Sequence, residues 1–289
     1  MGRGFARCRF DGEFRTHQAE ALAAFDRVTR RDADGDRPQG DGDRSRGDRA
    51  YLVLPPGAGK TLVGLEAARR LGRPTLVLGP NTAIQAQWLR TWERFTPRTV
   101  TATSDRAMPT PLTVLTYQAV AVFDPDAEVD EDGRRRRRRP RPGDLLARLH
   151  ENGRALVERM RAGGPWTLVL DECHHLLEVW GRLLVDLIEY VEAGDADRVA
   201  VVGLTATPRT TLTPSQAALV TRLFGDLTSA VSTPALVRTG HVAPYQELAY
   251  ITTPTAEESD DIRSEAERFV ELRTDLLDPR FGSTSFLQW

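Results

Sequence analysis

The fold is decided by one stretch of sequence, YLVLPPGAGKTLVGLEAARRLG, at residues 51–72. Its apolar beginning predicts a buried strand at 51–54, and its periodic end predicts a helix at 59–71 that Gly72 closes. A glycine-rich turn joins the two elements. A strand, a glycine-rich turn and a helix in this order are typical of a loop that binds phosphates.

The glycine-rich turn predicts how ATP would be bound. Gly57 and Gly59 let the backbone wrap closely around an anion, and the helix that follows directs its positive end to the same place. Lys60 is expected to reach the β and γ phosphates, and Thr61 to place its hydroxyl on the Mg²⁺ that bridges them. The generic pattern begins with a further glycine, and Leu54 stands in its place. The residues predicted to bind ATP here are Pro56, Gly57, Ala58, Gly59, Lys60 and Thr61.

Lysine usage singles out one position. The chain contains 39 basic residues, and only Lys60 is a lysine. Arginine is a planar fork, whereas lysine is a compact point charge on a flexible stem, so a site that places one ammonium group between two phosphates would not accept arginine readily. We therefore predict that Lys60 is a catalytic residue.

A second chemical motif, WTLVLDECHH, occupies residues 166–175. Its apolar part predicts a buried strand, and an acid at the carboxyl end of such a strand lies beside the phosphate-binding turn in a doubly wound sheet. Asp171 is expected to hold Mg²⁺, and Glu172 to polarise the water that attacks the γ phosphate. Many strands end in acids at the start of a helix, so the motif gains its weight from the phosphate-binding turn. Cys173 is expected to be a packing residue.

Composition excludes several other classes of protein. Of the 289 residues 40% are hydrophobic, and the formal net charge is −2, so any nucleic-acid binding must come from local patches. No apolar run approaches the roughly 18 residues of a membrane span, and the amino terminus is charged. Cys8 and Cys173 lack metal-ligand spacing and suit a reducing compartment. We expect a cytoplasmic protein without a membrane partner.

Short apolar runs alternate with amphipathic stretches along the chain. This alternation predicts an α/β fold with a doubly wound, mostly parallel sheet flanked by helices. The other predicted strands are 75–79, 112–117, 167–171, 198–204 and 247–252. The other predicted helices are 81–95, 144–161, 174–192, 214–223 and 256–274.

Two stretches are too polar to contribute to a core. Residues 29–49 and 124–143 are rich in charge, glycine and proline, and we predict them to be disordered insertions. The second contains six consecutive arginines, Arg134–Arg139, preceded by six acidic residues. The near neutrality favours a solvated loop, while an arm that contacts DNA stays open. We assign residues 1–253 to one nucleotide-binding domain and 254–289 to a tail or the start of a linker.

PPGAGKT at 55–61 and DECHH at 171–175 together resemble motifs I and II of superfamily 2 helicases of the DExH type. That superfamily uses the same variant of the phosphate-binding turn, which accounts for the missing first glycine. The resemblance implies a RecA-like fold of the P-loop NTPase class. FRTHQAEAL at 14–22 resembles the Q motif in a short form, which implies that Arg15 and Gln18 lie near the adenine.

The segment GLTATP at 203–208 resembles motif III of the same superfamily. By that resemblance Thr205 and Thr207 would couple the ATP site to the nucleic-acid track, and His174 would relay between two lobes. The neighbouring His175 fits an ordinary helix-start residue better than a functional one.

Two further segments, LVLGPNTAIQAQW at 76–88 and VLTYQAV at 114–120, resemble motifs Ia and Ib, which hold the nucleic-acid backbone. Trp88 fits a core position better than a contact with nucleic acid. The residues assigned to nucleic acid by this resemblance are Pro80, Asn81, Thr82, Gln87, Thr116 and Tyr117.

The short Q motif and the QW of motif Ia resemble type III restriction motor subunits and DNA translocases of the XPB and UvsW types. This implies DNA rather than RNA as the partner, because a DEAD-box RNA helicase would show a longer Q motif and DEAD in place of DECH. The segment at 236–255 also resembles the end of the first lobe in that group.

The resemblance implies the ATP-binding lobe of a DNA helicase or translocase that couples Mg-ATP hydrolysis to movement on DNA. Such motors hydrolyse ATP between two RecA-like lobes, and the second lobe supplies arginine fingers. Only 34 residues follow residue 255, so we expect a second lobe in cis or in trans and slow turnover by this lobe alone. The alternative is a stand-alone ATP-dependent DNA- or protein-binding module without efficient turnover. A AAA-type ATPase fits the Q-motif and TATP segments less well.

Overall fold

The computed structural model describes residues 2–29, 48–120, 144–176, 179–209, 211–244 and 252–277. It consists of two compact units, Met1–Ala243 and Pro244–Trp289. In the second unit the structure describes a helix, α11 (Ala256–Leu277). No helix among the described residues is long and apolar enough to cross a membrane.

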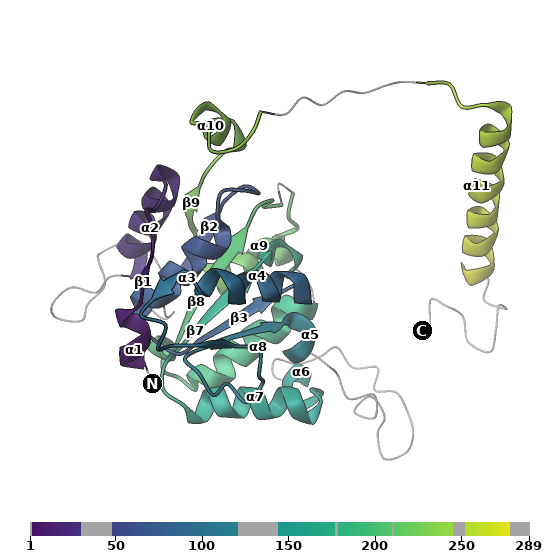
Figure 1. Ribbon diagram of the computed structural model, residues 1–289. Coiled ribbons are helices and arrows are strands. Elements are labelled where there is room, and N and C mark those ends of the chain that lie inside the picture. The colour runs from purple at the N-terminus through teal and green to yellow at the C-terminus, as the bar shows by residue number, and fades with distance from the viewer. Residues whose placement is uncertain are drawn as a thin grey trace, which may run out of the picture. The chain divides into compact units, whose positions relative to one another are not determined.

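The first unit is built on a seven-stranded sheet in which every pairing is parallel (Figure 1). Its strand order is β5-β6-β3-β7-β8-β2-β9. The strands are β2 (Arg49–Val53), β3 (Thr75–Gly79), β5 (Ala102–Thr103), β6 (Leu112–Thr116), β7 (Trp166–Asp171), β8 (Val199–Thr205) and β9 (Leu227–Ala230). The central strands are continuous apolar runs because helices cover both faces.

Helices pack on both faces of this sheet (Figure 1). One face carries α1 (Gly2–Arg7), α2 (Thr16–Thr29), α3 (Lys60–Leu71) and α4 (Thr82–Trp92). The other carries α5 (Tyr117–Val120), α6 (Asp144–Ala147), α7 (Glu151–Ala162), α8 (Val179–Glu192) and α9 (Pro214–Phe224). The remaining elements are α10 (Thr233–Arg238), the short 3₁₀ helices η2 (Cys173–His175) and η3 (Ala196–Arg198), and the antiparallel pair β1 (Arg9–Phe10) and β4 (Phe95–Thr96).

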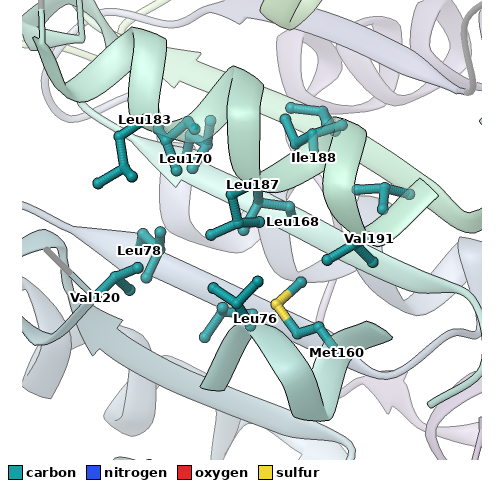
Figure 2. Packing of buried hydrophobic residues seen from close by; sticks show 14 of the residues in the cluster. Leu76, Leu78, Val120, Met160, Leu168, Leu170, Leu183, Leu187, Ile188 and Val191 are labelled. Carbon is teal, nitrogen blue, oxygen red and sulfur yellow. The ribbon is translucent and has the colours of Figure 1, made fainter. Parts of the chain in front are cut away.

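Each central strand sends alternate side chains into two separate cores. In β3, Leu76 and Leu78 belong to the core under α7 and α8, while Val77 belongs to the core under α3 and α4. Figure 2 shows the first of these cores, in which Leu187 and Met160 pack against β3 and β7. The period of two along each strand therefore produces the doubly wound architecture.

The predicted fold class is confirmed by this sheet. The predicted strands at 51–54, 75–79, 112–117, 167–171 and 198–204 correspond to β2, β3, β6, β7 and β8. The helix predicted at 59–71 is α3, and Gly72 ends it at a φ of 67°, donating its N–H to Ala68 and Arg69. The helices predicted at 81–95, 214–223 and 256–274 correspond to α4, α9 and α11.

Two predicted helices are divided in the structure. The stretch 144–161 forms α6 and α7, because His150 is extended and its ring accepts the N–H of Asn152 at the start of α7. The stretch 174–192 contains η2 and then α8, with residues 177–178 outside the described residues. Elements that were not predicted are α1, α2, α5, α10, η3, β1, β4, β5 and β9.

Several predictions fall outside the described residues. Those parts of the chain are 30–47 and 121–143, including Arg134–Arg139, and 245–251 of the strand predicted at 247–252. The first predicted insertion was 29–49, and its two end residues belong to regular elements. Thr29 is the last residue of α2, and Arg49 is the first residue of β2. The structure divides after Ala243, and the domain limit at residue 253 stays a prediction.

Candidate nucleotide-binding site

The predicted phosphate-binding turn, residues 55–61, runs from the carboxyl end of β2 into the first residues of α3. The N–H of Leu54 donates to the carbonyl of Thr205 at 2.9 Å, which ties the turn to β8. Gly57 and Gly59 have φ angles of 78° and 85°, a region that L side chains rarely adopt. A Cβ at Gly59 would lie 2.4 Å from Nε2 of Gln18 and would displace this amide from its contact with Ala58.

The start of α2 is hydrogen-bonded to the phosphate-binding turn. The amide of buried Gln18 accepts the N–H of Arg15 at 3.0 Å and donates to the carbonyl of Ala58 at 2.9 Å. Nε2 of His17 lies 3.0 Å from the same carbonyl oxygen, so this nitrogen carries the proton in that contact. The side chain of Arg15 is exposed. His17 was not predicted from the sequence, although it stands between the two residues that were.

The lysine of the turn meets the carboxylate that follows β7. Nζ of Lys60 lies 2.9 Å from Oε1 of Glu172, and the two side chains are 13% and 23% exposed. Glu172 has a φ of 51°, which is unusual for a non-glycine residue and stores backbone strain. The structure therefore brings the two predicted catalytic residues together at the carboxyl edge of the sheet, where ligands of doubly wound folds bind.

Asp171 is held from three directions. Its Oδ2 accepts the indole N–H of Trp88 at 2.7 Å, and its Oδ1 accepts the N–H of Glu172 at 2.9 Å. The hydroxyl of Tyr117 donates to its backbone carbonyl at 2.8 Å. Burial raises the pKa of the Asp171 carboxyl, and the charge of Glu172 adds to this, while the Trp88 hydrogen bond and Lys60 oppose it.

His174 joins this edge to the end of β8. Its Nδ1 lies 2.9 Å from Oγ1 of Thr205 and 3.5 Å from Oε2 of Glu172. Its Nε2 lies 3.5 Å from Oγ1 of Thr207, whose N–H donates to Thr205. Burial lowers the pKa of His174, and the neighbouring His175 adds to this, so the ring is neutral near pH 7. The predicted coupling residues are thus in mutual contact.

The oxygen atoms at this edge suit Mg²⁺. The hydroxyl of buried Thr61 and the carboxylate of Asp171 are hard oxygen donors, the kind that this ion prefers. Within the described parts of the chain, no group of three or more His, Cys, Asp and Glu side chains could hold a metal by itself.

Residues 11–210, about two thirds of the chain, match the protein family described as the type III restriction enzyme, res subunit. The chain belongs to this family. Its phosphate-binding turn, its Asp171–His174 group and Thr205–Thr207 all lie within the matched residues. The sequence resemblance to superfamily 2 helicases is confirmed by this match. The chain therefore contains a helicase-type RecA-like domain.

Solved structures similar to this res-family chain include helicases and a restriction enzyme. The Hef helicase domain of Pyrococcus furiosus is 21% identical with a TM-score of 0.39, and the match covers 62% of this chain and 34% of that one. The UvsW helicase of bacteriophage T4 is 17% identical with a TM-score of 0.41, at coverages of 75% and 60%. A nuclease-deletion mutant of the Type ISP restriction-modification enzyme LlaGI, solved with a DNA substrate mimic, is 15% identical with a TM-score of 0.42, at coverages of 93% and 23%.

This chain spans between 23% and 60% of the length of those solved chains. No curated protein matches it.

The residues that the resemblance assigns to nucleic acid fall into two groups in this res-family domain. Asn81 and Thr82 are exposed at the start of α4, where the Asn81 side chain accepts the N–H of Ile84. Pro80 and Thr116 are half-buried at the carboxyl ends of β3 and β6. These four residues therefore share one edge of the sheet.

The other two assigned residues contact Thr61 and Asp171 of the candidate nucleotide site. Nε2 of Gln87 donates to Oγ1 of Thr61 at 3.2 Å, and Tyr117 is buried with its hydroxyl on the backbone of Asp171. Cys173 is buried, and burial raises its pKa well above the ordinary value, as expected of a packing residue.

Proposed function

We propose that this chain is the ATP-binding lobe of a DNA helicase or translocase that couples Mg-ATP hydrolysis to movement on DNA. The observation that carries the proposal is the pairing of Lys60 with Glu172 beside Asp171 at the carboxyl edge of the sheet. A lysine after a glycine-rich turn and two acids after β7, which β8 separates from β2 in the sheet, are the groups that phosphoryl transfer from ATP requires.

Each residue has a defined part in this proposal. Backbone N–H groups of Gly57, Gly59 and the first turn of α3 bind the phosphates, and Lys60 leaves Glu172 to neutralise the β and γ phosphates. Thr61 and Asp171 hold Mg²⁺, which supplies charge neutralisation of the triphosphate when it is bound.

Glu172, once released from Lys60, accepts a proton from the attacking water. His174 holds the second carboxylate oxygen of Glu172 within 3.5 Å, and this contact keeps the base aligned. Because burial lowers the pKa of His174, this ring contacts Thr205 and Thr207 as a neutral hydrogen-bonding group and not as a cation.

We further propose that DNA lies along the edge formed by Pro80, Asn81, Thr82 and Thr116. The start of α4 offers backbone N–H groups and exposed polar side chains, which are the groups that commonly contact phosphates of nucleic acid. A second RecA-like lobe, in cis or in trans, completes hydrolysis by supplying arginine to the transition state.

The test is the fate of bound nucleotide in the Glu172→Gln variant. Purified protein in excess over radiolabelled ATP is filtered after a fixed time, and the bound nucleotide is separated. We expect Glu172→Gln to bind ATP as tightly as the wild type and to convert it more slowly by about 10²- to 10⁴-fold, the range for loss of a general base.

Glu189→Gln is the matched control, because Glu189 pairs with Arg222 on an exposed surface. Equal conversion by Glu172→Gln and the control would contradict the role of Glu172.

The DNA part of the proposal is tested by titrating DNA and RNA of one sequence with and without a non-hydrolysable ATP analogue. We expect DNA to bind better and its affinity to respond to the analogue. Nucleotide binding without any effect on DNA would favour a binding module that acts on protein.

A further inference from the structure

Trp88 makes a contact that its position in the sequence does not suggest. The side chain is fully buried on α4, and its indole N–H donates to Oδ2 of Asp171 at 2.7 Å, across a separation of 83 residues. A buried indole N–H usually finds a hydrogen-bond partner. The indole N–H of Trp92, one turn further along α4, donates to the backbone carbonyl of Val100. Trp88 donates instead to the carboxylate proposed to hold Mg²⁺.

The helix that carries Lys60 is shaped to admit this indole. Gly64 lies one turn after Lys60 in α3, and a Cβ at Gly64 would lie 2.5 Å from Cη2 of Trp88 and 2.6 Å from Cδ1 of Leu204. Neither the large ring nor the β8 side chain could stay in place if this residue were alanine. Glycine inside a helix costs roughly 0.5–1 kcal/mol relative to alanine, so its presence here is explained by the space that Trp88 occupies.

The contacts of Asp171 fix the carboxylate in one orientation. With Oδ2 on Trp88 and Oδ1 on the N–H of Glu172, rotation about the Cβ–Cγ bond would break both hydrogen bonds. Each oxygen keeps a further lone pair for another partner. Gln87, the neighbour of Trp88, donates to the hydroxyl oxygen of Thr61, so consecutive residues of α4 reach both proposed metal ligands.

We propose that Trp88 is a positioning residue of the metal site, orienting the Asp171 carboxylate for Mg²⁺ through its indole N–H. The inference rests on the proposed function, since it needs Asp171 to bind the ion. Helix α4 begins at Thr82 with Asn81 as its N-cap, and both residues are proposed to meet DNA. Gln87 and Trp88 lie in its second turn. One rigid helix therefore connects the DNA edge to both metal ligands, so a shift of α4 changes the geometry at the metal.

The test measures metal affinity rather than turnover. Mn²⁺ replaces Mg²⁺, and free Mn²⁺ is followed by electron paramagnetic resonance as it is titrated into the whole chain with saturating ADP. We expect Trp88→Phe to weaken Mn²⁺ binding by about 10- to 100-fold, the usual loss when a partner that orients a metal ligand is removed. Binding of fluorescent ADP in EDTA is expected to stay within about twofold of wild type, because the phosphate-binding turn is untouched.

Trp92→Phe is the matched control, since Trp92 is a buried indole on the same helix whose N–H meets a backbone carbonyl. It is expected to bind Mn²⁺ and ADP as the wild type does. Replacement of Trp88 by 3-benzothienylalanine, which keeps the bicyclic shape and lacks the N–H, separates the hydrogen bond from packing and stands in for Trp88→Phe if that variant does not fold. It is expected to lose Mn²⁺ affinity to the same extent.

Wild-type Mn²⁺ affinity in the benzothienyl variant would overturn the inference while leaving the proposed function intact. A wild-type chain that binds neither ADP nor Mn²⁺ would overturn the proposed function itself. A loss of Mn²⁺ affinity equal in Trp88→Phe and Trp92→Phe would also overturn the inference, because the effect would then come from α4 packing and not from the contact with Asp171.

Discussion

The two edges of the central sheet both carry ion pairs, and they use them differently. At the amino edge, Arg49 pairs with Glu192 at 2.7 Å and also donates to the carbonyl of Val199. At the carboxyl edge, Lys60 pairs with Glu172 at 2.9 Å. Burial does not separate the two pairs, because their side chains are 8% and 13% exposed at the amino edge and 13% and 23% exposed at the carboxyl edge.

The difference lies in the cation and in the backbone around it. An arginine fork binds several acceptors at fixed angles, which suits a joint between a strand and a helix end. A lysine is a point charge that can exchange one anion for another, and here it follows two glycines with positive φ. We therefore expect the amino edge to stabilise the fold and the carboxyl edge to exchange ligands.

The largest effect on stability is expected from Arg49→Met. Loss of the arginine leaves Glu192 half-buried without its partner and removes a donor from Val199, which we expect to destabilise the fold by about 3 kcal/mol. Urea unfolding of the variant measures this. Affinity for Mg-ATP should stay at the wild-type value, and a tenfold loss of that affinity would show that the edges are not separate.

The same substitution at the other edge, Lys60→Met, is expected to do the reverse. Loss of the charge that neutralises the β and γ phosphates should weaken ATP binding by about 100-fold, near 2.7 kcal/mol. Glu172 is more exposed than Glu192, so water replaces part of the lost partner and the free energy of unfolding in urea should fall by less than in Arg49→Met, by about 1 kcal/mol. A large loss of stability with normal ATP affinity would place Lys60 with the structural arginines.

A smaller effect is expected from backbone strain at Glu172. With φ at 51°, glycine should be more stable than alanine at this position by about 1 kcal/mol, because both variants lose the same carboxylate and only alanine keeps the strain. Ala193, with φ at 47° at the amino edge, gives the matched comparison through Ala193→Gly. The thermal unfolding midpoints of Glu172→Gly, Glu172→Ala and Ala193→Gly measure this strain. If Glu172→Ala were more stable than Glu172→Gly, that result would argue against strain at position 172.

The smallest effect is expected from pH. Burial lowers the pKa of His174 below the ordinary 6.5, so the unfolded chain takes up this proton at a higher pH than the folded chain does. The contribution of His174 to stability is therefore fully present above pH 6.5 and is lost as pH falls through the folded pKa. The decline in stability between pH 7 and 5 should be shallower in His174→Gln than in wild type, and identical slopes would contradict a lowered pKa of His174 in the folded chain.

Much of the fold could be predicted because its signals are local. The apolar run at Thr75–Gly79 and the glycine at 72 each depend on neighbouring residues, and both elements were predicted correctly. Strand β9 was missed because LTSA lacks an apolar run, as fits an edge strand that is largely exposed. The break between α6 and α7 was missed because a histidine ring at His150 provides the helix cap, which is a weak signal in sequence.

Part of the candidate site could also be predicted from local sequence signals. Lys60 and Glu172 carry motif signals, and their pairing follows from parallel strands that end at one edge. The contacts of Trp88 and His17 depend on how α4 and α2 pack, and spacing along the chain does not encode that packing. The sequence left Trp88 open between a core position and a contact with nucleic acid, and the structure shows it fully buried with a hydrogen bond to Asp171.

The central claim is that the carboxyl edge of the sheet binds Mg-ATP through Lys60. Its most direct test is a titration of the chain with fluorescent ATP, with Mg²⁺ and with EDTA, in the wild type, Lys60→Met and Arg49→Met. We predict saturable binding with a dissociation constant between about 1 μM and 1 mM, strengthened by Mg²⁺, retained by Arg49→Met and lost by Lys60→Met. Absence of saturable binding to the wild type, or equal binding by Lys60→Met, would contradict the account.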